Sequence, residues 1–110
     1  MLSRPYRLTA RADFARVKST GVRIDHPLFT LLVAPSDSLR FGYVVSKVIS
    51  KRAVDRNHIR RLLSEAISHK LPSMNAKADV VILAKRSLLS FSLVAIEAAL
   101  DDAFTRAHLI

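Results

Sequence analysis

Apolar residues recur at helical spacing in three stretches of the 110-residue chain. The first is short: Ala10, Phe14 and Val17 fall on one stripe of a helix. Thr9 is the expected N-cap of this helix, and Gly21 is its expected C-terminal stop.

A longer helix is predicted from about Ala53 to about Lys70, and it ends before Pro72. Its apolar stripe recurs at the spacing i, i+3, i+4, i+7, i+8 and comprises Ile59, Leu62, Leu63, Ala66 and Ile67. A third helix begins near Ser92 and turns Asp101 and Asp102 away from its own stripe of Leu93, Ile96, Leu100, Ala103 and Phe104.

Runs rich in β-forming residues separate these helices. "HPLFTLLVAP" and "RFGYVVSK" flank the turn-like "PSDS", which predicts an antiparallel hairpin, and a further short strand is expected at 22–24. "ADVVILAK" is a continuous apolar run, which is typical of a strand covered on both faces.

The predicted order is α-β-β-β-α-β-α, an α+β sandwich in which helices cover one mixed sheet. "FGYVVSK", the helix 53–70 and "DVVILA" form a βαβ unit. There is no internal repeat and no long linker, so residues 1–110 are predicted to form a single domain.

Composition narrows the functional classes. Half of the residues are apolar, which suffices for a core, and the absence of cysteine fits a reducing compartment. No apolar run has the length of a membrane span, and the N-terminal stretch has no signal-peptide core. We therefore expect a cytoplasmic protein without membrane contacts.

The net charge of +9 is unevenly placed. Residues 1–61 hold 13 Lys and Arg against 4 Asp and Glu, whereas residues 62–110 hold 5 of each kind. Six of these basic residues fall between Lys47 and Arg61, opposed only by Asp55. This asymmetry favours a polyanionic partner for the first half of the chain.

On the second predicted helix, Arg56, Asn57, Arg60, Arg61 and Ser64 spread along one flank of the apolar stripe. Guanidinium groups match phosphate oxygens in a bidentate manner. Lys47, Lys51 and Arg52 precede the helix, near its positive end. These residues predict a nucleic-acid surface, RNA or DNA; a merely solvated basic face is the alternative.

No catalytic motif is recognisable. The two glycines stand too far apart for a P-loop, and the four histidines lack metal-binding spacing. Any catalysis is therefore expected to come from a partner.

The segment "VSKVISKRAVDRNHIRRLLSEA" resembles the signature of the bacterial ribonuclease P protein family, approximately V-S-K-K-x-x-x-x-A-V-x-R-N-R-I-K-R-x-x-R-E-A-F. Two further segments are similar to family motifs in the same order. "RLTARADFARVKSTG" is similar to R-L-x-x-x-x-D-F-x-x-V-x-x-x-G, and "DVVILAKR" is similar to D-x-V-x-x-A-R.

The resemblance implies a subunit that assists a catalytic RNA in removing the 5′ leader from precursor tRNA. The RNA and its Mg²⁺ would perform the hydrolysis, with no metal bound by the protein alone. The expected partners are ribonuclease P RNA, in a 1:1 complex with a monomeric protein, and precursor tRNA. The implied fold is similar to domain 2 of ribosomal protein S5, with a left-handed βαβ crossover against the general right-handed rule.

Carried over by residue, the family motif implies an RNA-subunit surface of Lys47, Lys51, Arg52, Arg56, Asn57, His58, Arg60 and Arg61. The implied leader cleft, between the first helix and the sheet, contains Arg11, Phe14, Lys18, Thr30 and Leu32. Phe14 would stack on an unpaired base, although its spacing fits a core aromatic equally well. The chain departs from the signature at Val48, His58 and Ser64.

Two other classes stay open at this point. A ribosomal or ribosome-assembly protein would share the charge and the compartment, but it would not stimulate leader removal. A basic nuclease would cleave RNA without an RNA subunit.

Overall fold

The computed structural model describes residues 2–110, and its helices and strands follow the predicted order. The elements are a 3₁₀ turn at Arg4–Tyr6, α1 (Arg11–Thr20), β1 (Val22–Asp25), β2 (Phe29–Pro35), β3 (Arg40–Val44), α2 (Ala53–Lys70), β4 (Ala78–Ala84) and α3 (Leu93–Arg106), with further 3₁₀ turns at Leu71–Ser73 and Arg86–Ser90.

The four strands form one mixed sheet in the order β1-β2-β4-β3. β1 and β4 both pair with β2 in antiparallel fashion, and β3 pairs with β4 in parallel. The predicted hairpin between β2 and β3 is therefore wrong, because the apolar strand β4 lies between them. The antiparallel hairpin is formed instead by β2 and the short strand β1.

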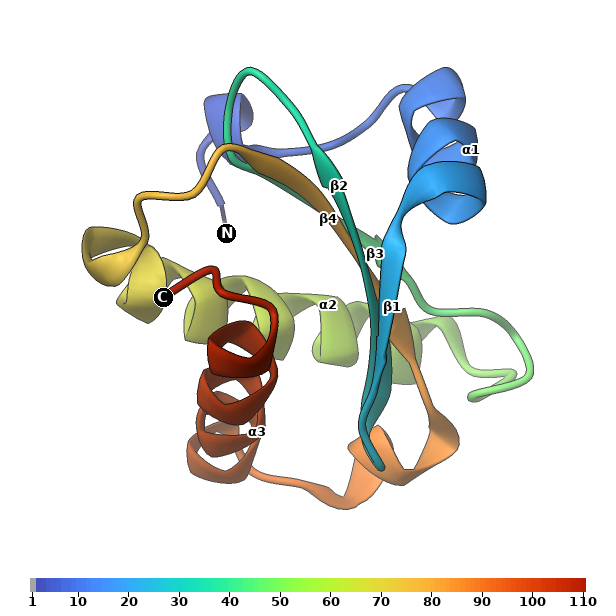
Figure 1. Ribbon diagram of the computed structural model, residues 1–110. Helices are drawn as coiled ribbons and strands as arrows, with labels where there is room; N and C mark the ends of the chain where they lie inside the picture. Colours follow the sequence, from blue (N-terminus) through green and yellow to red (C-terminus); the bar gives the residue numbers. More distant parts are fainter. Residues whose placement is uncertain (1) are drawn as a thin grey trace.

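The β3-α2-β4 unit connects two adjacent parallel strands. In Figure 1 the chain descends through β3 at the back, runs from right to left through α2 on the same side of the sheet as α3, climbs to the top and descends again through β4 in front of β3. This is a left-handed crossover, as the family resemblance implied.

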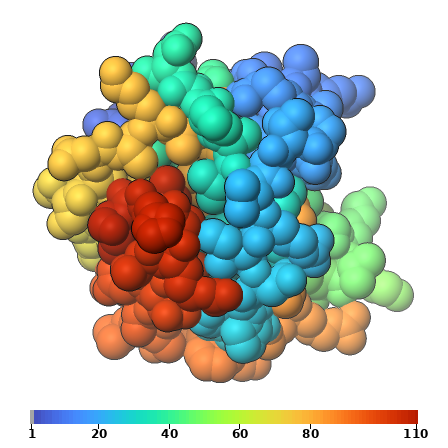
Figure 2. Space-filling model, in the orientation of Figure 1, coloured from blue at the N-terminus to red at the C-terminus, as the bar shows by residue number. Residues whose placement is uncertain are grey.

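The sheet is covered on both faces (Figure 1). α2 and α3 bury the larger core against one face, where Phe41 and Phe104 pack with ring centroids 6.0 Å apart. α1 covers part of the other face over a smaller cluster that includes Val17 and Val81. Figure 2 shows α3, in red, lying beside the β1–β2 hairpin at the surface.

The helix ends follow local chemistry. α2 has the predicted bounds, and the Ser92 hydroxyl caps α3 by accepting a hydrogen bond from the Ala95 N–H at 3.3 Å. The predicted N-cap Thr9 is wrong, because α1 has Ala10 at its N-cap and no side-chain cap. Gly21 does end α1: a Cβ there would lie 2.4 Å from the Val17 carbonyl oxygen.

Within residues 2–110, no helix combines the length and the apolar character that a membrane crossing requires.

Candidate nucleic-acid interface

The basic flank of α2 consists of Arg56, Asn57, Arg60 and Arg61. The opposite side of the helix is buried, and it carries Ile59, Leu63, Ala66 and Ile67 into the larger core. Docking of this apolar stripe leaves Asn57 and Arg61 exposed and Arg56 and Arg60 half-buried. The predicted flank is thus brought together as one surface, except for Ser64.

Ser64 is only 5% exposed and is not part of the flank. Its hydroxyl donates a hydrogen bond to the Tyr43 hydroxyl at 3.2 Å. The helical angle of Ser64 had placed it beside the arginines, but β3 covers this position because Tyr43 reaches across to the helix.

Two arginines of the flank are held by neutral acceptors. Arg56 Nη1 donates to the Ser50 carbonyl at 2.9 Å. Arg60 donates to Asn57 Oδ1 at 3.1 Å and to the Val45 carbonyl at 3.4 Å. No carboxylate within residues 2–110 pairs with Arg56, Arg60 or Arg61. Arg56 and Arg60 are therefore held in place while the flank keeps its full positive charge, which suits phosphate binding.

The loop 46–52 extends this charge toward the N-terminus of α2. Ser50 fixes the turn, since its hydroxyl donates to Asp55 Oδ2 at 2.8 Å and accepts from the Arg52 N–H at 3.2 Å. Lys47, Lys51 and Arg52 are exposed on the loop.

The same loop lines a depression of about 630 Å³ whose far side is Arg86. Arg86 donates to the Val48 carbonyl at 3.0 Å. Sequence reasoning did not assign Arg86 to this surface, although Arg86 is the last residue of the quoted segment "DVVILAKR". His58 is exposed on α2, as predicted.

The residues predicted for the leader cleft lie on the α1 face of the sheet. Arg11 and Lys18 are exposed on α1, and Phe14 is half-buried. The Phe14 ring lies directly over Gly42, where a Cβ would stand 2.4 Å from Phe14 Cζ. Gly42 therefore makes the space for this ring.

Thr30 and Leu32 are buried on β2. Leu32 belongs to the small cluster that Phe14 packs against, so it supports the ring from below. Thr30 Oγ1 donates to Asp25 Oδ1 at 3.0 Å, and hydrogen bonds from Arg23 and Thr30 lower the pKa of Asp25. The contact of the predicted cleft residues with a leader stays a prediction for all five of them, Arg11, Phe14, Lys18, Thr30 and Leu32.

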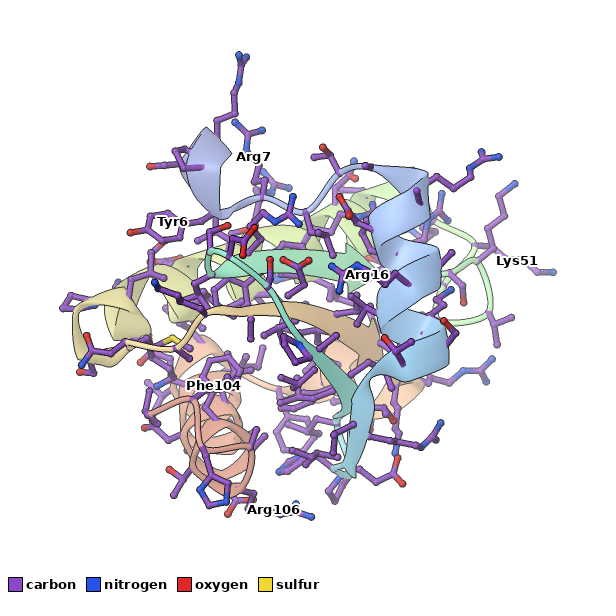
Figure 3. All side chains as sticks on the ribbon, turned by 45° about the horizontal axis from the view of Figure 1, so that its top comes forward. Tyr6, Arg7, Arg16, Lys51, Phe104 and Arg106 are labelled. Atoms are coloured by element: carbon purple, nitrogen blue, oxygen red, sulfur yellow. The ribbon has the colours of Figure 1, made fainter. Side chains whose placement is uncertain are left out.

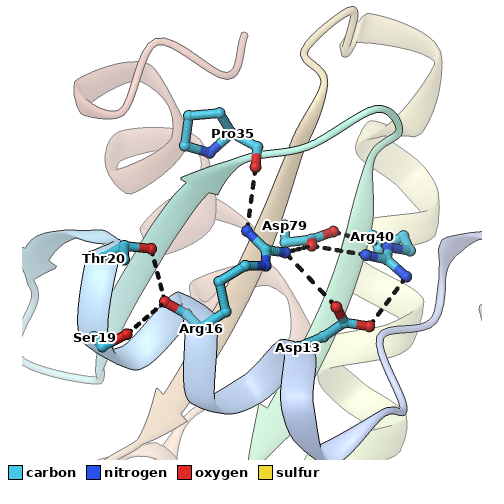
Figure 4. A network of polar contacts seen from close by, with 7 residues as sticks. All are labelled: Asp13, Arg16, Ser19, Thr20, Pro35, Arg40 and Asp79. Carbon is cyan, nitrogen blue, oxygen red and sulfur yellow. Dashed lines mark hydrogen bonds and ion pairs between the residues drawn. The ribbon is translucent and has the colours of Figure 1, made fainter.

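A cluster of four charged residues docks α1 on the sheet, and we call it the paired cluster (Figure 4). Asp79 on β4 has no exposed surface. Its two carboxylate oxygens accept from Arg40 Nε and Nη2, each at 2.8 Å, and Oδ2 also accepts from Arg16. Asp13 adds contacts of 3.4 Å to Arg40 and 3.9 Å to Arg16.

These contacts have an electrostatic consequence. The hydrogen bonds that Arg40 donates to Asp79 are the main reason that the pKa of Arg40 is raised above its ordinary value. Arg16 also donates to the Pro35 carbonyl at 3.3 Å, so α1 is tied to both β2 and β4. Sequence reasoning did not assign this role to the four residues, although Asp13 and Asp79 stand in the motifs quoted above.

Comparison with known proteins gives consistent matches along the chain. Residues 2–108 match the family model described as ribonuclease P. The "Ribonuclease P protein component" of Xanthomonas euvesicatoria is 36% identical over 104 residues, covering 94% of this chain and 68% of that protein. The protein of the same name from Thioalkalivibrio sulfidiphilus is 31% identical, covering 94% of this chain and 87% of that protein.

Solved structures match the fold. The RNase P protein of Staphylococcus aureus superposes with a TM-score of 0.85 at 24% identity, covering 94% of this chain and 96% of the other. The RNase P protein of Thermotoga maritima gives a TM-score of 0.82 at 21% identity, covering 91% and 96%.

Proposed function

Because the chain belongs to the ribonuclease P family and functions as a ribonuclease P subunit, we propose that the basic flank of α2 binds the RNA subunit. The observation that carries the proposal is the absence, within residues 2–110, of any carboxylate partner for Arg56, Arg60 or Arg61. Contacts to backbone carbonyls hold the guanidinium groups of Arg56 and Arg60 in place without neutralising them, so phosphates supply the counter-charge. Lys47, Lys51, Arg52 and His58 extend this surface.

The α1 face of the sheet, in this proposal, holds the 5′ leader of precursor tRNA. Phe14 is fixed against Gly42 while part of its ring stays exposed, which provides one stacking platform. Arg11 and Lys18 lie exposed on the same helix and contact leader phosphates. Thr30 and Leu32 form the floor below them.

The RNA subunit carries out the hydrolysis with its own Mg²⁺. Within residues 2–110 no group of three or more His, Cys, Asp or Glu is placed to hold a metal ion. The buried carboxylate of Asp79 is committed to Arg16 and Arg40. In this proposal the protein contributes to binding and not to the bond-breaking step, in a 1:1 complex that acts in the cytoplasm.

Reconstitution with a bacterial ribonuclease P RNA tests this function. We expect the protein to lower the Mg²⁺ concentration at which the RNA removes the leader from precursor tRNA, and to cleave nothing alone. Cleavage at the mature 5′ end by RNA-free protein would establish a nuclease instead. Binding to ribosomal RNA without any stimulation of leader removal would favour an assembly protein.

A further inference from the structure

A small pocket lies between the N-terminal segment, β3 and α2, and we call it the N-terminal pocket. Its volume is about 170 Å³. Leu8 and Phe41, both nearly inaccessible, form its floor together with Tyr43. Arg7, Arg60 and Arg61 form its rim, so an apolar hollow is surrounded on several sides by guanidinium groups.

Backbone pairing holds the pocket in shape. The Leu8 N–H donates to the Phe41 carbonyl at 2.9 Å, and Arg7 makes a parallel bridge with Phe41. The N-terminal segment thus runs beside β3 like a short additional strand. Figure 3 places Tyr6 and Arg7 on this segment, away from α1 and from Lys51 on the opposite side of the molecule.

The size of the pocket selects one flat ring. A cavity of about 150 Å³ in a protein interior holds one benzene molecule. The N-terminal pocket is only slightly larger, so a six-membered ring fits, whereas the two fused rings of a purine overfill it.

The polar groups of the pocket suit a base with a carbonyl edge. The Ser64 hydroxyl donates to the Tyr43 hydroxyl at 3.2 Å, which leaves the phenol O–H to donate to a ligand. Burial raises the pKa of Tyr43 to about 12, so the phenol keeps this proton at neutral pH.

The charge around the pocket selects an anionic ligand. None of the lining residues is acidic, and no carboxylate within residues 2–110 pairs with Arg7, Arg60 or Arg61. In an RNA partner, the group that combines a flat ring with a neighbouring negative charge is a nucleotide. Arg60 and Arg61 also belong to the basic flank, and the pocket opens beside α2, not on the α1 face.

We propose that the N-terminal pocket receives one unstacked pyrimidine of the RNA subunit, with Arg7 and Arg61 on its neighbouring phosphates. The inference rests on the proposed function of the basic flank and adds a base contact to it. Ser64 is part of this site: the family signature has an arginine at this position, and the smaller serine leaves room beside Tyr43.

Photocrosslinking of the assembled complex tests the contact directly. The RNA subunit is transcribed with 5-iodouridine, and in a second preparation with 5-iodocytidine, bound to the full chain and irradiated, and the crosslinked peptides are identified by mass spectrometry. We expect crosslinks to the peptide that contains Tyr43. In a parallel sample only the precursor-tRNA leader carries 5-iodouridine, and there the Tyr43 peptide is expected to remain unmodified.

A pocket-filling variant tests the energetic contribution. Thr9 is exposed at the rim, so Thr9→Trp fills the pocket without removing a charge. We expect a roughly 5- to 150-fold weaker Kd for the RNA subunit, the range of one lost base stack. The dependence of Kd on salt is expected to be unchanged, because no phosphate contact is lost. Thr105→Trp, at an exposed position on α3, is the matched control.

The outcomes separate this inference from the function on which it rests. Two results would overturn the base pocket and leave the basic flank in place. One is wild-type protein that binds the RNA subunit without a Tyr43 crosslink, and the other is a Thr9→Trp variant that binds the RNA subunit as tightly as the control variant does. If Thr9→Trp fails to fold, the wild-type crosslink alone decides. Failure of the wild-type chain to bind the RNA overturns both proposals.

Discussion

The paired cluster and the basic flank both use arginine, but they use it differently. In the paired cluster, Arg16 and Arg40 face the carboxylates of Asp13 and Asp79 on neighbouring elements. In the basic flank, Arg56 and Arg60 face backbone carbonyls and an amide. The first arrangement joins α1 to the sheet, and the second leaves positive charge at the surface.

This difference supports the proposal that the partner of an arginine, and not the density of arginines, separates a structural role from a nucleic-acid-binding role. A carboxylate cancels the charge and fixes two elements together. A carbonyl orients the guanidinium while its charge remains available to a phosphate. The comparison predicts that mutations in the paired cluster mainly lower stability, whereas mutations in the basic flank mainly weaken RNA binding.

The largest effect is expected for Asp79→Asn. The substitution keeps the shape of the side chain but leaves Arg16 and Arg40 without their buried counter-charge. Breaking a buried pair costs about 3 to 5 kcal/mol, and we expect about 3 kcal/mol because Arg40 is 28% exposed. Urea unfolding measures this loss.

Arg60→Ala is the control for Asp79→Asn. It should change the free energy of unfolding by less than about 1.5 kcal/mol, the usual contribution of one hydrogen bond. If the two variants lose similar stability, the comparison between the clusters fails.

The next effect concerns Phe14, which the paired cluster holds in position through α1. Phe14→Ala should weaken holoenzyme binding of precursor tRNA by about 1 to 3 kcal/mol, the contribution of one stacked base. Mature tRNA, which has no leader, should bind as before. Equilibrium binding of the two RNAs measures the difference.

Two further variants separate stacking from packing at Phe14. Phe14→Leu keeps an apolar contact with Gly42 but removes the aromatic ring, so it should lose leader binding and retain stability. Gly42→Ala should displace the ring that it now supports. Equal losses for precursor and mature tRNA would assign Phe14 to the core alone.

A smaller and more specific effect is expected for the basic flank. Arg56→Ala or Arg60→Ala should each reduce the slope of log K against log salt for the RNA subunit by about 0.7 to 0.9, one phosphate contact. Filter binding over a range of salt concentrations gives the slope. Glu65→Ala, on the same helix, is the control. If Arg56→Ala and Arg60→Ala show the same salt slope as Glu65→Ala, the proposed RNA surface is contradicted.

The smallest effect concerns the pH dependence of stability, which we expect to come from His26 and not from the paired cluster or the basic flank. Burial lowers the pKa of His26, and its neutral Nδ1 accepts the Leu28 N–H at 3.1 Å. In the unfolded chain the His26 imidazole binds a proton near pH 6.5, whereas in the native state it binds this proton only at a lower pH. The contribution of His26 to the free energy of unfolding should therefore be fully present above about pH 6.5 and should decline as the pH falls below that value.

His26→Asn keeps a hydrogen-bond acceptor and cannot titrate, so this decline should disappear in thermal melts between about pH 7.5 and 5.5. A variant with the wild-type pH profile would assign the decline to another group. Arginines stay protonated throughout this range, so neither cluster should contribute to it.

Helices and the basic flank were predictable because they depend on local spacing. The i, i+3, i+4 pattern of Ile59, Leu63 and Ile67 places the helix and its buried side, and so places Arg56, Arg60 and Arg61 outside. The unbroken apolar run of β4 predicted a strand covered on both faces, and the burial of residues 78–82 confirms this.

Strand partners and buried charges were not predictable in the same way. The short connection from Pro35 to Arg40 favoured a hairpin, but the sequence between two strands does not exclude a third strand from inserting between them. Asp79 meets Arg16 across 63 positions of sequence, and no local pattern reports such a contact. Ser64 was misplaced because helical angle alone does not reveal that Tyr43 covers it.

The position of β4 has a consequence for the newly made chain. β4 is the last strand to be synthesised, yet it pairs with both β2 and β3. At about 5 to 20 residues per second, the ribosome needs about 2 to 8 seconds to proceed from Val44 to Ala84. During this interval β3 lacks its parallel partner β4 and α2 has no complete sheet to pack against, so the nascent chain displays its arginines before it has the fold that orients them.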